Sequence, residues 1–139
     1  MLIGDVPVKV LPFADEAQVQ RDIEEADLLY MPLHFGDEHE NFARYSLSTK
    51  MVTYIGSGVP ILYHGPTSSA AFDLLGKHRA AILAPTLAPD EIARALADLT
   101  PGTRAEITRH ALHLARTSFM LADQTQRFWQ TISQNLAHV

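Results

Sequence analysis

Two apolar stretches, each leading into a helix start, constrain the fold of this sequence more than any other feature. Residues 28–31 and 61–63 are almost wholly apolar, and the segments beginning near Thr49 and Ser69 carry apolar residues at helical spacing. A buried strand followed by a helix is the repeating unit of a parallel α/β sheet. The first turn of each helix presents unpaired backbone N–H groups and the positive end of the helix dipole. Both helix starts are therefore predicted anion sites.

The same alternation extends along most of the chain. Strands are predicted at residues 8–13, 27–33, 59–64 and 80–84, and helices after Asp15, at 49–57 and at 69–76, with Gly58 as a left-handed stop. Three further helices are expected after Pro89, after Pro101 and after residue 120. This order predicts an α/β fold: a Rossmann-like, doubly wound parallel sheet with helices on both faces and additional C-terminal helices. Ligands of such sheets bind at the carboxyl ends of the strands.

Length and composition exclude several classes of protein. The 139 residues are enough for one domain with its own core. Without cysteine, the chain has no disulfide framework and no thiolate catalyst. Sixteen acidic against 11 basic residues, a net charge of -5, argue against a nucleic-acid partner. The sequence shows no signal peptide and no apolar run of roughly 20 residues, so no transmembrane segment is expected and the predicted localisation is cytoplasmic.

Four short motifs occur in a recognisable order. They are Ala26-Asp27, Leu29-Tyr30-Met31-Pro32, Gly56-Ser57-Gly58-Val59-Pro60-Ile61 and Gly65-Pro66. In order and spacing they resemble the C-terminal, donor-binding domain of GT-B fold glycosyltransferases of the group 1-like kind, and the resemblance runs from about Val8 onward.

The resemblance implies a nucleotide-sugar-binding Rossmann-like domain over residues 1–139, truncated at its N-terminal side. The complete enzyme would transfer a sugar from a nucleoside diphosphate sugar to an unknown acceptor, with the acceptor-binding domain N-terminal to this chain. No cofactor and no metal are implied, the catalytic residues are not assigned, and the chain alone is expected to be inactive. The family strand order, 3-2-1-4-5-6, makes the predicted strands its strands 3 to 6. Four parallel strands should then leave an edge at residues 8–13 or 28–31 that is exposed or covered by a second copy.

Five residues are carried over as donor-binding candidates. Ser48, Thr49 and Lys50 would face the diphosphate at a helix start, and His64 and Gly65 form the turn that would face the sugar. The alternatives are an ordinary helix cap followed by a solvated lysine, and an ordinary tight turn.

The sequence departs from the family at the residues that bind the donor ribose. Many relatives carry a glutamate where this chain has Thr53, and a second acidic residue would fall near Tyr45, unless Glu38 or Glu40 takes its role. The sequence therefore assigns neither of the two ribose contacts.

The segment from His34 to Arg44 is a long polar loop that could close over the sugar. A metal site at His34, Asp37 and His39 is the less favoured alternative, because the spacing matches no standard zinc motif.

Residues of the C-terminal helices have mainly structural interpretations. His110 and His113 are expected to be solvated, and Phe128-Trp129 is most simply core packing. The resemblance instead implies that the final helix exposes part of this aromatic pair or buries it against a second copy.

A different class of function remains open. The chain could be a stand-alone flavodoxin-like domain that binds a nucleotide or a protein without catalysis. A phosphorylated receiver domain is excluded, because Asp27 begins its predicted strand instead of ending it.

Overall fold

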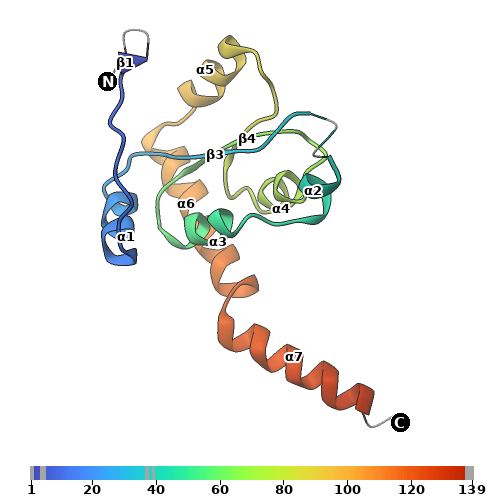
Figure 1. Cartoon of the computed structure of the whole chain (residues 1–139). Helices are drawn as coiled ribbons and strands as arrows, with labels where there is room; N and C mark the ends of the chain where they lie inside the picture. Colours follow the sequence, from blue (N-terminus) through green and yellow to red (C-terminus); the bar gives the residue numbers. More distant parts are fainter. Residues whose placement is uncertain (1, 4–5, 37, 39, 137–139) are drawn as a thin grey trace.

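Three parallel strands form the central sheet of the molecule (Figure 1). The structure is a computed structural model that describes residues 2–3, 6–36, 38 and 40–136. The strands β3 (Leu29–Pro32), β4 (Ile61–His64) and β5 (Ile82–Ala84) pair in that order, with Tyr30 opposite Leu62 and Leu62 opposite Ile82. The predictions of an α/β fold and of these three parallel strands are confirmed.

Three helices cover one face of this sheet and form the main core with it. They are α3 (Thr49–Gly56), α4 (Ala70–His78) and α6 (Pro101–Ser118). Alternate strand residues point to this face, and the buried cluster contains Met31, Ile61, Tyr63, Met51, Ile55, Ala71, Leu75, Ala111 and Leu114. Helix α5 (Pro89–Ala97) packs at β5 and lies on the other side of the strands in Figure 1. On this second face β3 is not covered, as the 51% exposed Tyr30 shows.

Local signals place the ends of these helices where the sequence predicts them. Gly58 has φ 80°, a left-handed conformation that suits glycine, and it follows Ser57, the C-cap residue of α3. Ser69 caps α4 by accepting a hydrogen bond from the backbone N–H of Phe72 at 2.9 Å. Arg79 ends the same helix in the left-handed region, at φ 51°.

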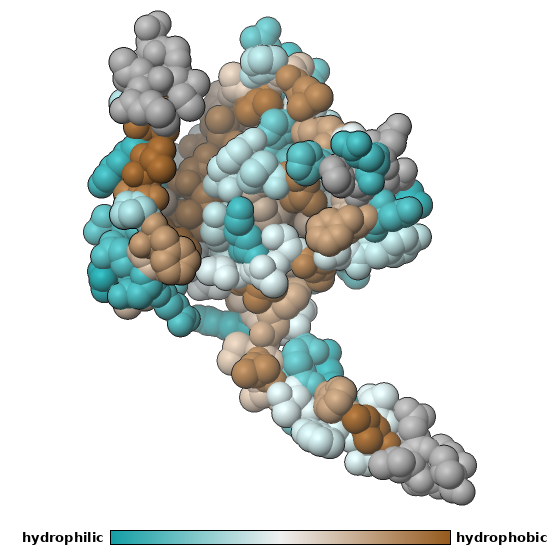
Figure 2. Space-filling view, viewed as in Figure 1, coloured by the Kyte–Doolittle hydropathy of each residue, from teal (hydrophilic) through white to brown (hydrophobic). Residues whose placement is uncertain are grey.

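The predicted first strand at residues 8–13 is wrong. Residues 8–13 form no strand; the strand β2 (Val6–Pro7) ends just before them and pairs antiparallel with β1 (Leu2–Ile3) in a two-stranded hairpin. Two prolines, Pro7 and Pro12, remove N–H groups that a longer ladder needs. The segment runs outside the sheet to α1 (Glu16–Glu24), and Figure 2 shows apolar side chains along it, Phe13 being fully exposed. The described central sheet therefore has three strands instead of four.

The strand β3 forms one edge of that sheet, as predicted for residues 28–31. The backbone N–H groups of Leu29 and Leu33 bond to the β4 side, at Pro60 and His64, so the backbone N–H of Tyr30 and the backbone nitrogen of Pro32 point away from β4. Pro32 has no N–H to offer there, which shortens the edge available to another strand. Arg104 of α6 fixes the approach to β3 by donating to the carbonyl of Asp27, whose carboxylate lies 3.6 Å from the guanidinium.

The prediction of a polar loop from His34 to Arg44 is wrong for its second half. Residues Glu40–Tyr45 form a short helix, α2, which packs on α4. Burial of Ala43 against the domain explains the helix, since a single turn is not stable in isolation.

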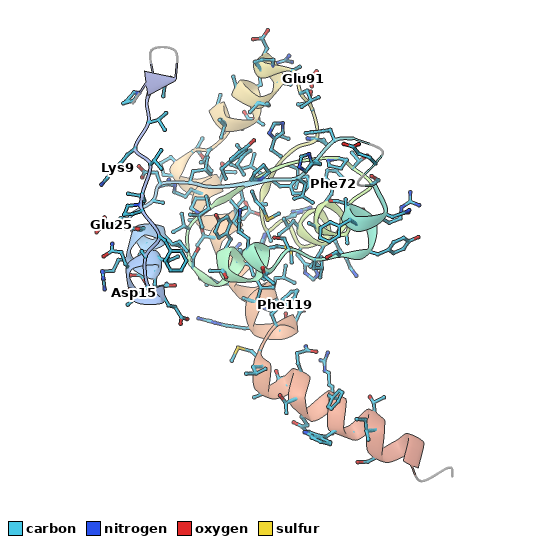
Figure 3. The ribbon with its side chains drawn as sticks, in the orientation of Figure 1. Lys9, Asp15, Glu25, Phe72, Glu91 and Phe119 are labelled. Atoms are coloured by element: carbon cyan, nitrogen blue, oxygen red, sulfur yellow. The ribbon has the colours of Figure 1, made fainter. Side chains whose placement is uncertain are left out.

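The last helix, α7 (Leu121–Leu136), projects away from the rest of the molecule (Figures 1 and 2). Phe119, partly buried against the core, lies at the junction with α6 (Figure 3). Phe128 and Trp129 are 57% and 60% exposed, so their interpretation as core residues of this chain is wrong, and the pair is available to solvent or to a second copy. Among the helices that the structure describes, none is long and apolar enough to cross a membrane.

Candidate functional site

A pocket of about 480 Å³ opens at the carboxyl end of β3. The strand and its continuation form one wall, α2 and the segment after it form a second, and the start of α3 forms the third. The lining residues are Pro32, Leu33, His34, Phe42, Ala43, Ser46, Leu47, Ser48 and Thr49. Two of the five predicted donor-binding residues, Ser48 and Thr49, therefore lie in one pocket at the edge of the sheet where ligands of such folds bind.

The start of α3 differs chemically from the other helix starts. Ser48 occupies the N-cap position, with φ -67° and ψ 130°, yet its side chain accepts no hydrogen bond from the helix. The side chains of Asp15, Ser69 and Thr100 do cap their helices. Helix α5 also lacks a side-chain cap, but its first turn carries acidic residues, whereas that of α3 carries none. Among the described helices of eight or more residues, only α3 combines an uncapped start with a first turn free of acid.

Lys50 adds a full positive charge to this first turn. Its side chain is exposed and forms no hydrogen bond or ion pair with the part of the chain that the structure describes. The residue follows Thr49 directly but does not line the pocket. An anion in the pocket would therefore meet the helix dipole first and the lysine charge at longer range.

The second predicted anion site, at the start of α4, is closed by the protein itself. The Ser69 side chain is fully buried, and its Oγ lies 2.6 Å from Tyr63 Oη. Tyr63 Oη donates to the carbonyl of Pro66 at 2.7 Å, so Ser69 must donate to Tyr63 while accepting from Phe72 N–H. Burial is the main cause that raises the pKa of Tyr63; the Ser69 hydrogen bond opposes it and the charge of Asp73 adds to it. The ring of Phe72, labelled in Figure 3, lies 5.8 Å from that of Tyr63.

Gly65 is required by packing within the protein. A Cβ at this position would lie 2.7 Å from Tyr63 Oη and 2.8 Å from Leu33 Cβ, closer than real contacts allow. The residue is buried, so the close approach that glycine permits here is to its own neighbours. The structure thus favours the tight-turn interpretation of Gly65 over a contact with the sugar.

His64 is held on both sides by other parts of the sheet. Its Nδ1 lies 2.6 Å from Tyr30 Oη of β3, and its Nε2 lies 2.8 Å from the carbonyl oxygen of Thr86, which follows β5. The ring of Phe35 packs edge-on at 5.2 Å. Neither His64 nor Gly65 lines the α3 pocket. The five predicted residues therefore do not converge on one site.

The ribose candidates whose side chains the structure describes, Thr53, Tyr45 and Glu38, do not line the pocket. Thr53 Oγ1 faces the carbonyl of Thr49 within α3 at 3.5 Å, and Tyr45 is exposed on the groove between α2 and α4. Glu38 does not line the pocket, and the side chain of Glu40 is outside the described part of the structure.

The remaining candidates are the alternative metal set and the two histidines of α6. Of the alternative metal set, His34 lines the pocket, while Asp37 and His39 lie outside the described residues. Within those residues, no group of three or more His, Asp or Glu side chains could hold a metal ion. His113 is exposed as expected, but His110 is partly buried, and its Nδ1 has no hydrogen-bond partner among the described residues.

Sequence reasoning missed two features of the site. The contact of Tyr30 with His64 joins residues 34 positions apart, and only the strand register, which sets Pro32 opposite His64, brings them to one face. The pocket wall from α2 depends on Phe42 and Ala43, which lie in a segment of polar composition. No protein-family model matches the chain, and no curated protein sequence matches it.

Proposed function

We propose that this chain binds a nucleoside diphosphate sugar and is the donor-binding part of a glycosyltransferase of the GT-B kind. The observation that carries the proposal is the start of α3. This is an uncapped, acid-free helix N-terminus beside Lys50, and it lines a pocket at the carboxyl end of a parallel strand. Backbone N–H groups, a helix dipole and one cation are the features that bind a diphosphate.

The motif order of the sequence supports the same function. The segment from Ala26 to Pro66 resembles the donor half of these enzymes, and it forms β3, the α3 pocket and β4 in sequence. Transfer in this proposal is electrostatic: the helix start and Lys50 stabilise the charge that develops on the departing diphosphate. The acceptor would bind a second domain, so we expect the chain to bind the donor without transferring the sugar.

Calorimetric titration tests the proposal on the chain as it stands. The protein is titrated separately with UDP, GDP and ADP, with the glucose conjugate of each, and with inorganic phosphate. We expect saturable binding of one nucleoside diphosphate well above the affinity for phosphate. Absence of binding across the panel would reject the proposal and favour a domain that binds another protein.

A further inference from the structure

The Tyr30 and His64 side chains form a hydrogen-bonded pair on the open face of the sheet. Strand register sets Tyr30 opposite Leu62 and Pro32 opposite His64, so the two side chains share a face and meet diagonally across the strands. The Oη to Nδ1 distance is 2.6 Å, and the two rings lie 5.8 Å apart.

The partners of His64 fix the direction of both hydrogen bonds. The carbonyl oxygen of Thr86 can only accept, so Nε2 must carry a proton to bond with it at 2.8 Å. In a neutral imidazole the other nitrogen, Nδ1, is then a bare acceptor, and the bond at 2.6 Å needs the proton of the Tyr30 hydroxyl. The Tyr30 proton is therefore committed to His64.

What Tyr30 offers to a ligand follows from that commitment. Half of its side chain is exposed, while both nitrogens of His64 are occupied within the protein. The outward lone pair of Oη can accept a hydrogen bond but has no proton left to donate. The packing of Phe35 on the imidazole at 5.2 Å holds the ring in this orientation.

We infer that Tyr30, and not His64, contacts the ligand at this edge of the sheet, and that the Tyr30 hydroxyl only accepts hydrogen bonds from it. Its partner is then a hydroxyl that donates, such as one on the sugar of the donor. This identity of the ligand rests on the proposed function. Pro32, which lines the α3 pocket, follows Tyr30 by two residues on β3 and lies opposite His64 on β4, so the pair adjoins the pocket in which the diphosphate of the donor would lie.

The direction of the bonds is tested first, without any ligand. In ¹⁵N-labelled protein at pH 8, the two imidazole nitrogens of a neutral histidine differ strongly in chemical shift according to which one carries the proton. The chain has seven histidines, so the His64 signals are assigned by their loss in His64→Asn. We expect the proton on Nε2. A proton on Nδ1 would overturn the inference, because Tyr30 would then be free to donate.

Matched titrations test the ligand. For the parent, Tyr30→Phe and the control Tyr54→Phe, the affinity for a nucleoside diphosphate is compared with that for its glucose conjugate, using UDP, GDP and ADP. We expect Tyr30→Phe to reduce the preference for the conjugate by about 2- to 10-fold, the loss of one neutral hydrogen bond, with binding of the diphosphate itself unchanged. An unchanged preference in Tyr30→Phe would overturn the sugar contact. If the parent protein binds no nucleotide, both the proposed function and the contact of Tyr30 with a sugar are rejected. The histidine spectrum still tests whether Tyr30 donates its proton to His64.

Discussion

The hydroxyl groups of Tyr63 and Ser69 lie 2.6 Å apart in the interior, at the start of α4. This contact makes the two predicted anion sites unequal, because it satisfies the cap of α4 with buried protein groups and leaves α3 as the helix start with an open first turn. The same corner of the fold depends on a glycine, since the Tyr63 hydroxyl occupies the space beside Gly65.

Gly65→Ala should destabilise the protein by about 1–3 kcal/mol, the usual cost of forcing extra atoms into a packed interior. The added Cβ would lie 2.7 Å from Tyr63 Oη and 2.8 Å from Leu33 Cβ. Gly56→Ala is the matched control, because nothing lies within 4 Å of its Cβ position at the end of α3. Urea denaturation measures both, and equal stability of the two variants would contradict the packing role of Gly65.

Stability should fall in alkali because of Tyr63. Burial raises the pKa of this hydroxyl above its unfolded value of about 10, so the folded state holds the proton more tightly. The stabilisation is complete below pH 10 and is lost as the pH rises through the folded pKa. The pKa of Tyr54 is also raised by burial, so Tyr63→Phe should weaken this pH dependence without abolishing it. Urea denaturation between pH 8 and pH 11 tests this, and an identical pH dependence in Tyr63→Phe would contradict it.

Truncating the aromatic pair of α7 should cost little stability. Phe128 and Trp129 are more than half exposed, so Phe128→Ala and Trp129→Ala should each change the free energy of unfolding by about 0.5 kcal/mol or less. The control Leu114→Ala removes a fully buried side chain of α6 and should cost about 2–5 kcal/mol. A large loss in the α7 variants that persists at low protein concentration would contradict the exposed position of the pair, and a loss seen only at high protein concentration would show that a second copy covers it.

Lys50→Ala should weaken binding of a nucleoside diphosphate by about 1–3 kcal/mol, the scale of a charge-assisted hydrogen bond to an anion. Lys77→Ala is the control, because Lys77 lies in the last turn of α4 and not at the α3 pocket. Calorimetric titration of both variants is the measurement. If Lys50→Ala binds as tightly as Lys77→Ala, then Lys50 is an ordinary solvated lysine.

The sequence predicts the inner sheet well because its signals there are local. Apolar runs at β3 and β4, the cap at Ser69 and the stop at Gly58 each lie within a few residues of the element that they define. The segment at residues 8–13 has the strand pattern but no neighbouring strand, and a strand forms only when its backbone groups find a partner. Helix α2 shows the reverse case, in which packing on α4 makes a helix from a polar segment.

The site is predicted only in part for the same reason. Ser48 and Thr49 follow from a helix start, which is a local signal. The sequence predicts that a strand ends at His64, and this is confirmed, but the bonds of His64 to Tyr30 and Thr86 depend on the register of three strands. Gly65 faces Tyr63 and Leu33 instead of open space, which only the folded packing reveals.

Amide-resolved NMR titration with the nucleoside diphosphates tests the central claim most directly, because the chain contains its own control. Helices α3 and α5 both begin without a side-chain cap, but α5 carries Asp90 and Glu91 in its first turn, which should repel an anion. We predict that the backbone amides of residues 49–51 shift saturably with UDP, GDP or ADP, and that those of residues 90–92 do not. Equal shifts at both helix starts, or none at residues 49–51, would contradict a donor site at α3.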